Sequence, residues 1–260
     1  MIERTIGGRR CHIFTVGEPE CVILQPVQSL AEESLPSEAD LMARGSGRGF
    51  VFAAFEIGDW NRELSPWRAP PPRGREWFGN GAGGTLRYVE DVLLPAVRPG
   101  CGSAGVPVML GGYSLAGLFS LWAGTVSESF SAVVGASPSV WLGGWIGYAK
   151  RCGWNVRAAY LSLGDTEHET RNAMLSRSRA CIEETFADIS RAAVDCTLEW
   201  NPGGHFVDAA QRTARGFVWA IGRILGDSLP ATPSGRPRCC GPCPRRRRRG
   251  RPFCNHSGIP

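Results

Sequence analysis

The sequence predicts an α/β fold in which helices cover both faces of a mostly parallel central sheet. Short apolar runs alternate with longer segments of helical periodicity, as in repeated strand–helix–strand units. The apolar runs are nearly continuous, which is expected of strands that are buried on both faces. A chain of 260 residues with 43% apolar composition can bury one large core, so we expect one globular domain.

Six apolar runs are the predicted strands, and they lie at 21–27, 49–57, 106–111, 130–137, 156–164 and 196–200. Apolar residues recur at spacings of seven, four and three in 175–189 and every three or four positions in 210–225, which predicts two amphipathic helices. Weaker patterns predict helices near 29–43, 84–94, 116–126 and 142–150. The segment 60–84 has Pro and Gly throughout, so we expect a long irregular excursion after the second strand.

The composition changes at Gly226. We expect a folded domain over 1–225 and a disordered tail over 226–260, which is rich in Pro, Arg and Cys. The tail holds eight Arg and one Asp, which leaves 21 basic and 23 acidic residues in the rest of the chain. Only the tail is therefore a candidate for contact with nucleic acid or an anionic membrane, and we expect neither as the main function.

Four residues of the tail resemble metal ligands: Cys240, Cys243, Cys254 and His256. The second pair is too closely spaced for a usual zinc finger, and the five consecutive arginines between the pairs would repel a cation. We therefore expect no metal site.

No run approaches 18 consecutive apolar residues, and the N-terminus mixes charges with short apolar pieces. We therefore expect a soluble, cytoplasmic protein. Its thiols should be reduced and mostly buried instead of paired in disulfides.

The strongest motif is an apolar strand, the residues Gly112-Tyr113-Ser114-Leu115-Ala116-Gly117, and then an apolar helix. This pattern is typical of a nucleophile elbow, a tight turn that requires small residues two before and two after the serine. Glycine is commoner than alanine at the second of these positions, but Ala116 still meets the steric demand. The alternative is a serine that caps an ordinary helix in a glycine-rich turn.

A serine nucleophile needs a general base within hydrogen-bonding reach. His205 lies between the last predicted strand and the last predicted helix, where a loop can reach over the carboxyl edge of the sheet. The other histidines are placed less well: His12 precedes the predicted sheet, His256 is in the tail, and His168 is in the loop that should supply the acid. A surface histidine without a catalytic role is the alternative for His205.

The triad acid should follow the strand at 156–164, where Asp165, Glu167 and Glu169 come next. Spacing does not choose among these three carboxylates. The order serine, acid, histidine is that of α/β hydrolases, and it disfavours chymotrypsin-like and subtilisin-like proteases.

A tetrahedral intermediate also needs donors for its oxyanion. One donor should be the backbone N–H of Leu115. The second should come from the segment 25–28; because Pro26 has no N–H, the candidates there are Val27 and Gln25.

With these residues placed, the chain resembles the esterase family of α/β hydrolases that includes esterase D-type enzymes and siderophore esterases related to enterobactin esterase. The resemblance spans about 11–225 and depends on the motifs GGYSLAGLFSLWA, ASPSVW, YLSLGDTEHETRN and NPGGHF. It implies the α/β-hydrolase fold and a Ser-acid-His hydrolase of carboxylic esters or thioesters that needs no metal or organic cofactor. In such hydrolases the acid tends to follow the strand-ending glycine, here Gly164, by three residues, which favours Glu167 over Asp165.

The resemblance leaves the small-molecule ester open, because siderophore esterases act on large catecholate esters and esterase D-type enzymes on small thioesters. Four aromatic residues are candidates for the substrate pocket: Trp60, Trp67, Tyr113 and Trp141. Alternatively, Trp60 and Trp67 pack the excursion onto the body. An acyltransferase with the same triad and a catalytically silent binding protein remain as alternative functions.

Overall fold

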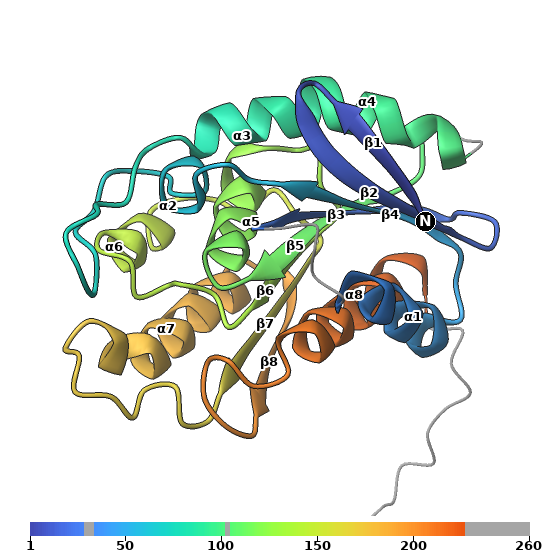
Figure 1. Cartoon of the computed structure of the whole chain (residues 1–260). Coiled ribbons are helices and arrows are strands. Elements are labelled where there is room, and N and C mark those ends of the chain that lie inside the picture. Colours follow the sequence, from blue (N-terminus) through green and yellow to red (C-terminus); the bar gives the residue numbers. More distant parts are fainter. Residues whose placement is uncertain (29–33, 102–104, 227–260) are drawn as a thin grey trace, which may run out of the picture. The chain divides into compact units, whose positions relative to one another are not determined.

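An eight-stranded sheet forms the centre of the computed structural model, which describes residues 1–28, 34–101 and 105–226 (Figure 1). The strand order across the sheet is β1-β2-β4-β3-β5-β6-β7-β8. The strands β3 to β8 run parallel to one another, and β1 and β2 form an antiparallel hairpin whose second strand, β2, also pairs antiparallel with β4. The strands are β1 (Ile2–Ile6), β2 (Arg9–Val16), β3 (Cys21–Val27), β4 (Phe50–Glu56), β5 (Val108–Tyr113), β6 (Ala132–Ala136), β7 (Ala158–Gly164) and β8 (Asp195–Asn201).

The predicted α/β class is confirmed, and each predicted strand agrees with an observed one to within two residues at either end. The N-terminal hairpin was not predicted, and the expectation that His12 precedes the sheet is wrong. His12 lies in β2 opposite Ala54 of β4 and is only 8% exposed. A signal for the hairpin is present in Gly7-Gly8, since both have positive φ, as a tight hairpin turn requires.

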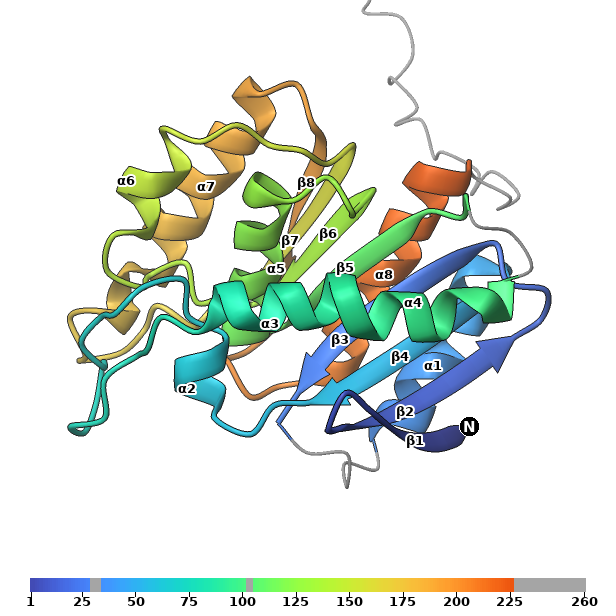
Figure 2. The same cartoon turned by 90° about the horizontal axis from the view of Figure 1, so that it is seen from above.

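Helices cover the two faces of the sheet separately (Figures 1 and 2). On one face α1 (Ser34–Ser46) packs beside α8 (Ala209–Leu225). The elements on the other face are α2 (Trp60–Glu63), α3 (Ala82–Tyr88), α4 (Leu94–Val97), α5 (Leu115–Val126), α6 (Trp145–Ala149) and α7 (Ser178–Arg191). A π turn (Val89–Leu93) joins α3 to α4, and short 3₁₀ turns occupy Arg98–Cys101 and Leu175–Arg177.

Strand geometry explains why the core has two parts. Successive side chains of a strand point to opposite faces, so Val22 and Leu24 of β3 pack under the larger helical layer while Cys21 and Ile23 pack against α1 and α8. Every residue of β3 is therefore buried. This double burial is the reason that its sequence is apolar without alternation.

The predicted helices are found, with differences at their ends. The prediction at 84–94 becomes α3, the π turn and α4, and the prediction at 29–43 becomes α1; its first residues, 29–33, lie outside the described residues. Among the helices described, none has the length and apolar composition needed to cross a bilayer. The tail at 227–260, with its Cys and His residues, also lies outside the described residues, so the domain boundary at 226 stays a prediction.

The topology brings three connections to one edge of the sheet. Because β5, β7 and β8 are parallel, the segments that follow their carboxyl ends emerge on the same side. Ser114 follows β5 directly, the acidic segment that begins at Asp165 follows β7 directly, and His205 comes four residues after β8. This edge is where open α/β sheets place their ligands.

Candidate active site

Ser114 occupies a strained turn between β5 and α5. Its backbone has φ 58° and ψ −117°, a conformation that non-glycine residues rarely adopt. A Cβ atom added to Gly112 would lie 2.6 Å from the Cβ of Ala116, so the two small residues that flank the serine touch each other. The geometry is that of a nucleophile elbow, with the serine at the N-terminus of a buried helix.

His205 bridges the serine and a carboxylate. Its Nε2 lies 3.1 Å from Ser114 Oγ, and its Nδ1 lies 2.8 Å from Glu167 Oε2. When Nδ1 carries the proton and donates it to the carboxylate, Nε2 presents a lone pair to the serine hydroxyl. The three groups therefore form a continuous hydrogen-bonded chain.

Glu167 is the buried end of this chain, with a side chain only 5% exposed. Its Oε1 accepts hydrogen bonds from Ser137 Oγ at 2.7 Å, from the Gly164 N–H at 2.7 Å and from Arg212 Nη1 at 3.2 Å. Burial alone raises the pKa of Glu167, but the hydrogen bonds from His205 and Ser137 outweigh it and hold this pKa below its ordinary value. The acid is therefore ionised near neutral pH.

Asp165 has a different place. Its carboxylate accepts the Gly203 N–H at 2.8 Å and so fastens the loop that carries His205, without touching the imidazole in the structure. Glu169 is exposed. Of the three carboxylates that the sequence left open, Glu167 is the one whose oxygen lies within hydrogen-bonding distance of His205.

Several solved structures resemble this chain. Siderophore hydrolase EstB from Aspergillus nidulans matches with a TM-score of 0.64 and 19% identity, over 84% of this chain and 92% of EstB. Enterobactin esterase FES from Shigella flexneri, solved in the presence of enterobactin, matches with a TM-score of 0.62 and 19% identity, over 86% of this chain and 58% of FES. BES protein from Bacillus cereus matches with a TM-score of 0.58 and 16% identity, over 81% of this chain and 89% of BES.

The chain has the α/β-hydrolase fold. The resemblance to siderophore esterases that the motifs predicted is thus confirmed at the level of the fold. Neither a protein-family model nor a curated protein matches the sequence.

In the α/β-hydrolase fold an oxyanion hole needs backbone donors beside the serine. Leu115 begins α5, so its N–H has no partner four residues earlier within the helix. The other predicted donors, Val27 and Gln25, point the wrong way. The carbonyl of Val27 accepts the Ile57 N–H, which follows β4, and the N–H and C=O of one strand residue face the same neighbour. Gln25, two residues earlier, faces β4 as well.

The alternate residues of β3, at even-numbered positions, face β5 instead. The N–H of Val22 donates to the carbonyl of Pro107, on the β5 side, and the same parity continues through Pro26 to Gln28. The pairing of Leu24 with Leu110 places Gln28 beside Ser114 when the register is continued. Since Pro26 has no N–H, Gln28 replaces Val27 and Gln25 as the second candidate donor.

The predicted pocket aromatics fall into two groups. Tyr113 lies at the site: its hydroxyl donates to the carbonyl of His205 at 2.6 Å, and the two rings are 5.3 Å apart. Trp67 instead donates to the carbonyl of Gly143 at 2.7 Å and so ties the excursion to the body of this α/β-hydrolase fold. Trp60 and Trp141 pack against the core, and a role for them in substrate binding stays a prediction.

Two serines near the site were not singled out from the sequence, although both lie in the ASPSVW motif. Ser137 has a positive φ of 43° and donates to Glu167. Ser139 Oγ lies 3.3 Å from Ser114 Oγ, and the Ser139 N–H donates to the Ser114 carbonyl. The segment between them therefore connects Ser114 to Glu167. Strain at such a position is common at functional sites.

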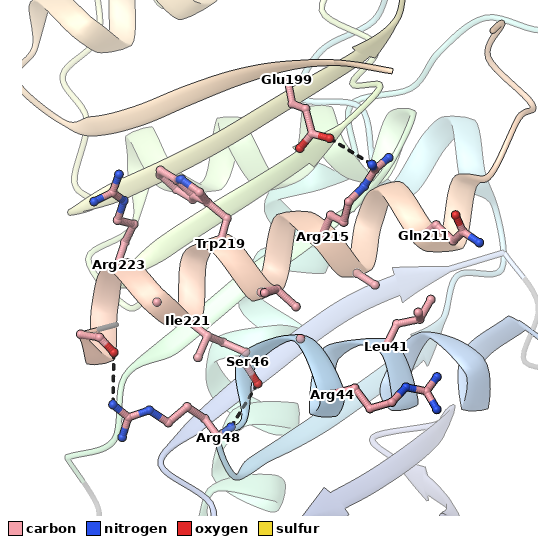
Figure 3. Close-up of a pocket in the computed structure, with 15 residues that line it drawn as sticks. Leu41, Arg44, Ser46, Arg48, Glu199, Gln211, Arg215, Trp219, Ile221 and Arg223 are labelled. Carbon is pink, nitrogen blue, oxygen red and sulfur yellow. Dashed lines mark hydrogen bonds and ion pairs between the residues drawn. The ribbon is translucent and has the colours of Figure 1, made fainter. Parts of the chain in front are cut away.

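A groove of about 760 Å³ lies between α1 and α8, away from this edge (Figure 3). Its floor is apolar and its rim carries Arg44, Arg48, Arg215 and Arg223. Each arginine has a carboxylate partner at 2.8 to 3.9 Å, so the rim offers little uncompensated charge. Because none of the three hydrogen-bonded residues lines the groove, it is not the candidate active site.

Proposed function

We propose that the protein is a serine esterase that hydrolyses carboxylic esters through an acyl-enzyme, with Ser114 as nucleophile, His205 as general base and Glu167 as the acid that orients it. The observation that carries this proposal is the line from Glu167 Oε2 through the imidazole to Ser114 Oγ, with distances of 2.8 and 3.1 Å. Esterases among the solved structures of the same fold support this class of reaction.

In the first half-reaction His205 Nε2 takes the hydroxyl proton as Ser114 Oγ attacks the ester carbonyl carbon. The carbonyl oxygen becomes an oxyanion that the N–H groups of Leu115 and Gln28 would stabilise. Collapse of this intermediate breaks the bond to the alcohol, which leaves with the proton from the imidazolium. Water then repeats the sequence on the acyl-enzyme and releases the acid.

The test is hydrolysis of nitrophenyl esters of increasing acyl length, together with a catecholate ester of serine, since the neighbours EstB and FES are named for siderophores. We expect Ser114→Ala and His205→Ala each to lower turnover by about 10⁴-fold or more. Ser176→Ala, which removes a hydroxyl outside the site, is the matched control.

A fluorophosphonate probe separates the alternative functions. A silent binding protein would leave Ser114 unlabelled, and an acyltransferase would label but transfer its acyl group to an added alcohol in preference to water. Unchanged hydrolysis by Ser114→Ala would reject the proposed nucleophile.

A further inference from the structure

Arg212 lies in the first turn of α8 and is only 1% exposed. Its guanidinium donates from Nη1 to Glu167 Oε1 at 3.2 Å, to Tyr113 Oη at 3.2 Å and to Ser137 Oγ at 3.4 Å. Nη2 donates to the carbonyl of Pro202 at 2.9 Å. A buried charge with this many donors in use is held in one position by its surroundings.

The carboxylate among these partners is that of Glu167, itself 5% exposed. Moving a guanidinium out of water is costly unless an opposite charge compensates it, so the two side chains neutralise each other. Breaking such a pair on one side leaves an uncompensated buried charge. The charge of Arg212 therefore acts directly on the ionisation of Glu167.

Arg212 also contacts His205 indirectly, through Tyr113 and through the loop that carries the histidine. The hydroxyl of Tyr113 accepts from Arg212 and donates to the backbone carbonyl of His205 at 2.6 Å. The bond to the Pro202 carbonyl holds the same loop three residues earlier. One guanidinium therefore contacts Glu167 and the start of the His205 loop directly, and the His205 carbonyl through the Tyr113 hydroxyl.

We propose that Arg212 is a positioning residue that locks Glu167 and the His205 loop together and whose charge opposes protonation of His205. The inference rests on the triad proposed above. An imidazole beside an uncompensated carboxylate holds its proton more strongly than one beside a carboxylate already paired with a cation. Removing the charge of Arg212 should therefore move the acid limb of the pH–rate profile to higher pH.

The other charged and titratable groups around His205 act more weakly. Asp165, on the Gly203 N–H, is exposed, and Arg215, which contacts Asn201 and Glu199, has a side chain 51% exposed, so solvent screens both. Burial raises the pKa of Tyr113, so its hydroxyl remains a neutral donor. Arg212 and Glu167 are the charges at this imidazole that solvent does not screen.

The test compares Arg212→Met, which removes the charge, with Arg212→Lys, which keeps it. For nitrophenyl acetate we expect Arg212→Met to lower kcat about 10- to 100-fold with little change in KM. The acid limb of its pH–rate profile should move up by about one pH unit. Arg212→Lys should also lower kcat in part, but the acid limb of its pH–rate profile should stay at the wild-type pH. Arg223→Met, which removes a charge from the far end of α8, should change neither.

A second readout does not depend on turnover. In a Ser114→Ala background, the titration midpoint of the His205 imidazole is measured by NMR, with His205→Gln to assign the signal. We expect a higher midpoint with Met than with Lys at position 212. Equal midpoints would overturn the role of Arg212, even if the protein is an esterase. A shifted midpoint without any esterase activity would sustain the role and reject the proposed function. Arg212→Gln replaces Arg212→Met if circular dichroism shows that the latter does not fold.

Discussion

The elbow around Ser114 and the proposed acid–base pair of Glu167 and His205 are built in opposite ways. The elbow lies within six consecutive residues, and it leaves so little room that a Cβ added at Gly112 would lie 2.6 Å from the Cβ of Ala116. The acid–base pair joins two loops separated by 38 residues and is supported by side chains from β5, α8 and the segment after β6.

We therefore expect substitutions in these two regions to have different effects. A substitution in the elbow strains the backbone itself, so its effect should appear in stability. Several donors together hold Glu167 and His205 in place. Loss of Glu167 should therefore lower activity severely, and loss of one supporting donor should lower it mildly. The predictions below test this contrast, starting with the largest expected effect.

Removing the acid should cost most. We expect Glu167→Gln to lower kcat about 10²- to 10⁴-fold, because the amide no longer fixes the imidazole tautomer or stabilises the imidazolium. Asp165→Asn, which changes the neighbouring carboxylate in the same way, should alter kcat by less than about threefold. The kinetics of nitrophenyl ester hydrolysis measure both effects. A larger loss of kcat in Asp165→Asn than in Glu167→Gln would make Asp165 the triad acid.

The elbow should respond in stability. Gly112→Ala places a Cβ 2.6 Å from that of Ala116, so we expect a loss of about 1 to 3 kcal/mol in the free energy of unfolding by urea. Gly153→Ala is the control, since a Cβ there meets nothing within 4 Å. Equal stability of the two variants would show that the turn relaxes freely.

Tyr113 connects the two regions, because it belongs to the elbow sequence and its hydroxyl holds the His205 carbonyl. Tyr113→Phe keeps the ring and removes one hydrogen bond, so we expect a fall in kcat of about 2- to 10-fold. Tyr148→Phe removes a hydroxyl that bonds Thr125 instead and should leave kcat unchanged. A loss as large as that of Glu167→Gln would contradict the idea of shared support.

The smallest expected effect is on how the free energy of unfolding depends on pH. The pKa of Glu167 in the folded protein lies below its ordinary value of 4.5, so its ionisation stabilises the fold above that value, and this contribution is lost as pH falls through the folded pKa. The difference in unfolding free energy between wild type and Glu167→Gln should therefore narrow from pH 6 to pH 3, as urea titrations would measure. Glu183→Gln, at an exposed helix position, provides the baseline for losing one carboxylate. A constant difference would indicate that ionisation of Glu167 contributes nothing.

Some features of this site left no readable trace in the sequence. Arg212 sits in an amphipathic helix pattern where an arginine is normally solvated, yet it is buried because the acid lies above it. Gln28 became a candidate oxyanion donor only once the hydrogen bonds of Val22 and Val27 gave the direction of each N–H along β3. The hairpin of β1 and β2 was missed because its strands, IERTI and RRCHIFTV, are rich in polar residues and carry no long apolar run.

The chain order of the strands from β3 onward and of the main helices, the elbow, and the position of His205 after the last strand could all be predicted from the sequence. Burial on both faces, helical periodicity and a tight turn all act between residues close along the chain, so they leave local patterns. The contact of Glu167 with His205, the contact of Arg212 with Glu167 and the direction of each N–H along β3 became visible in the three-dimensional structure alone. These depend on contacts between segments far apart along the chain, where a shift of one residue turns a group toward a different neighbour.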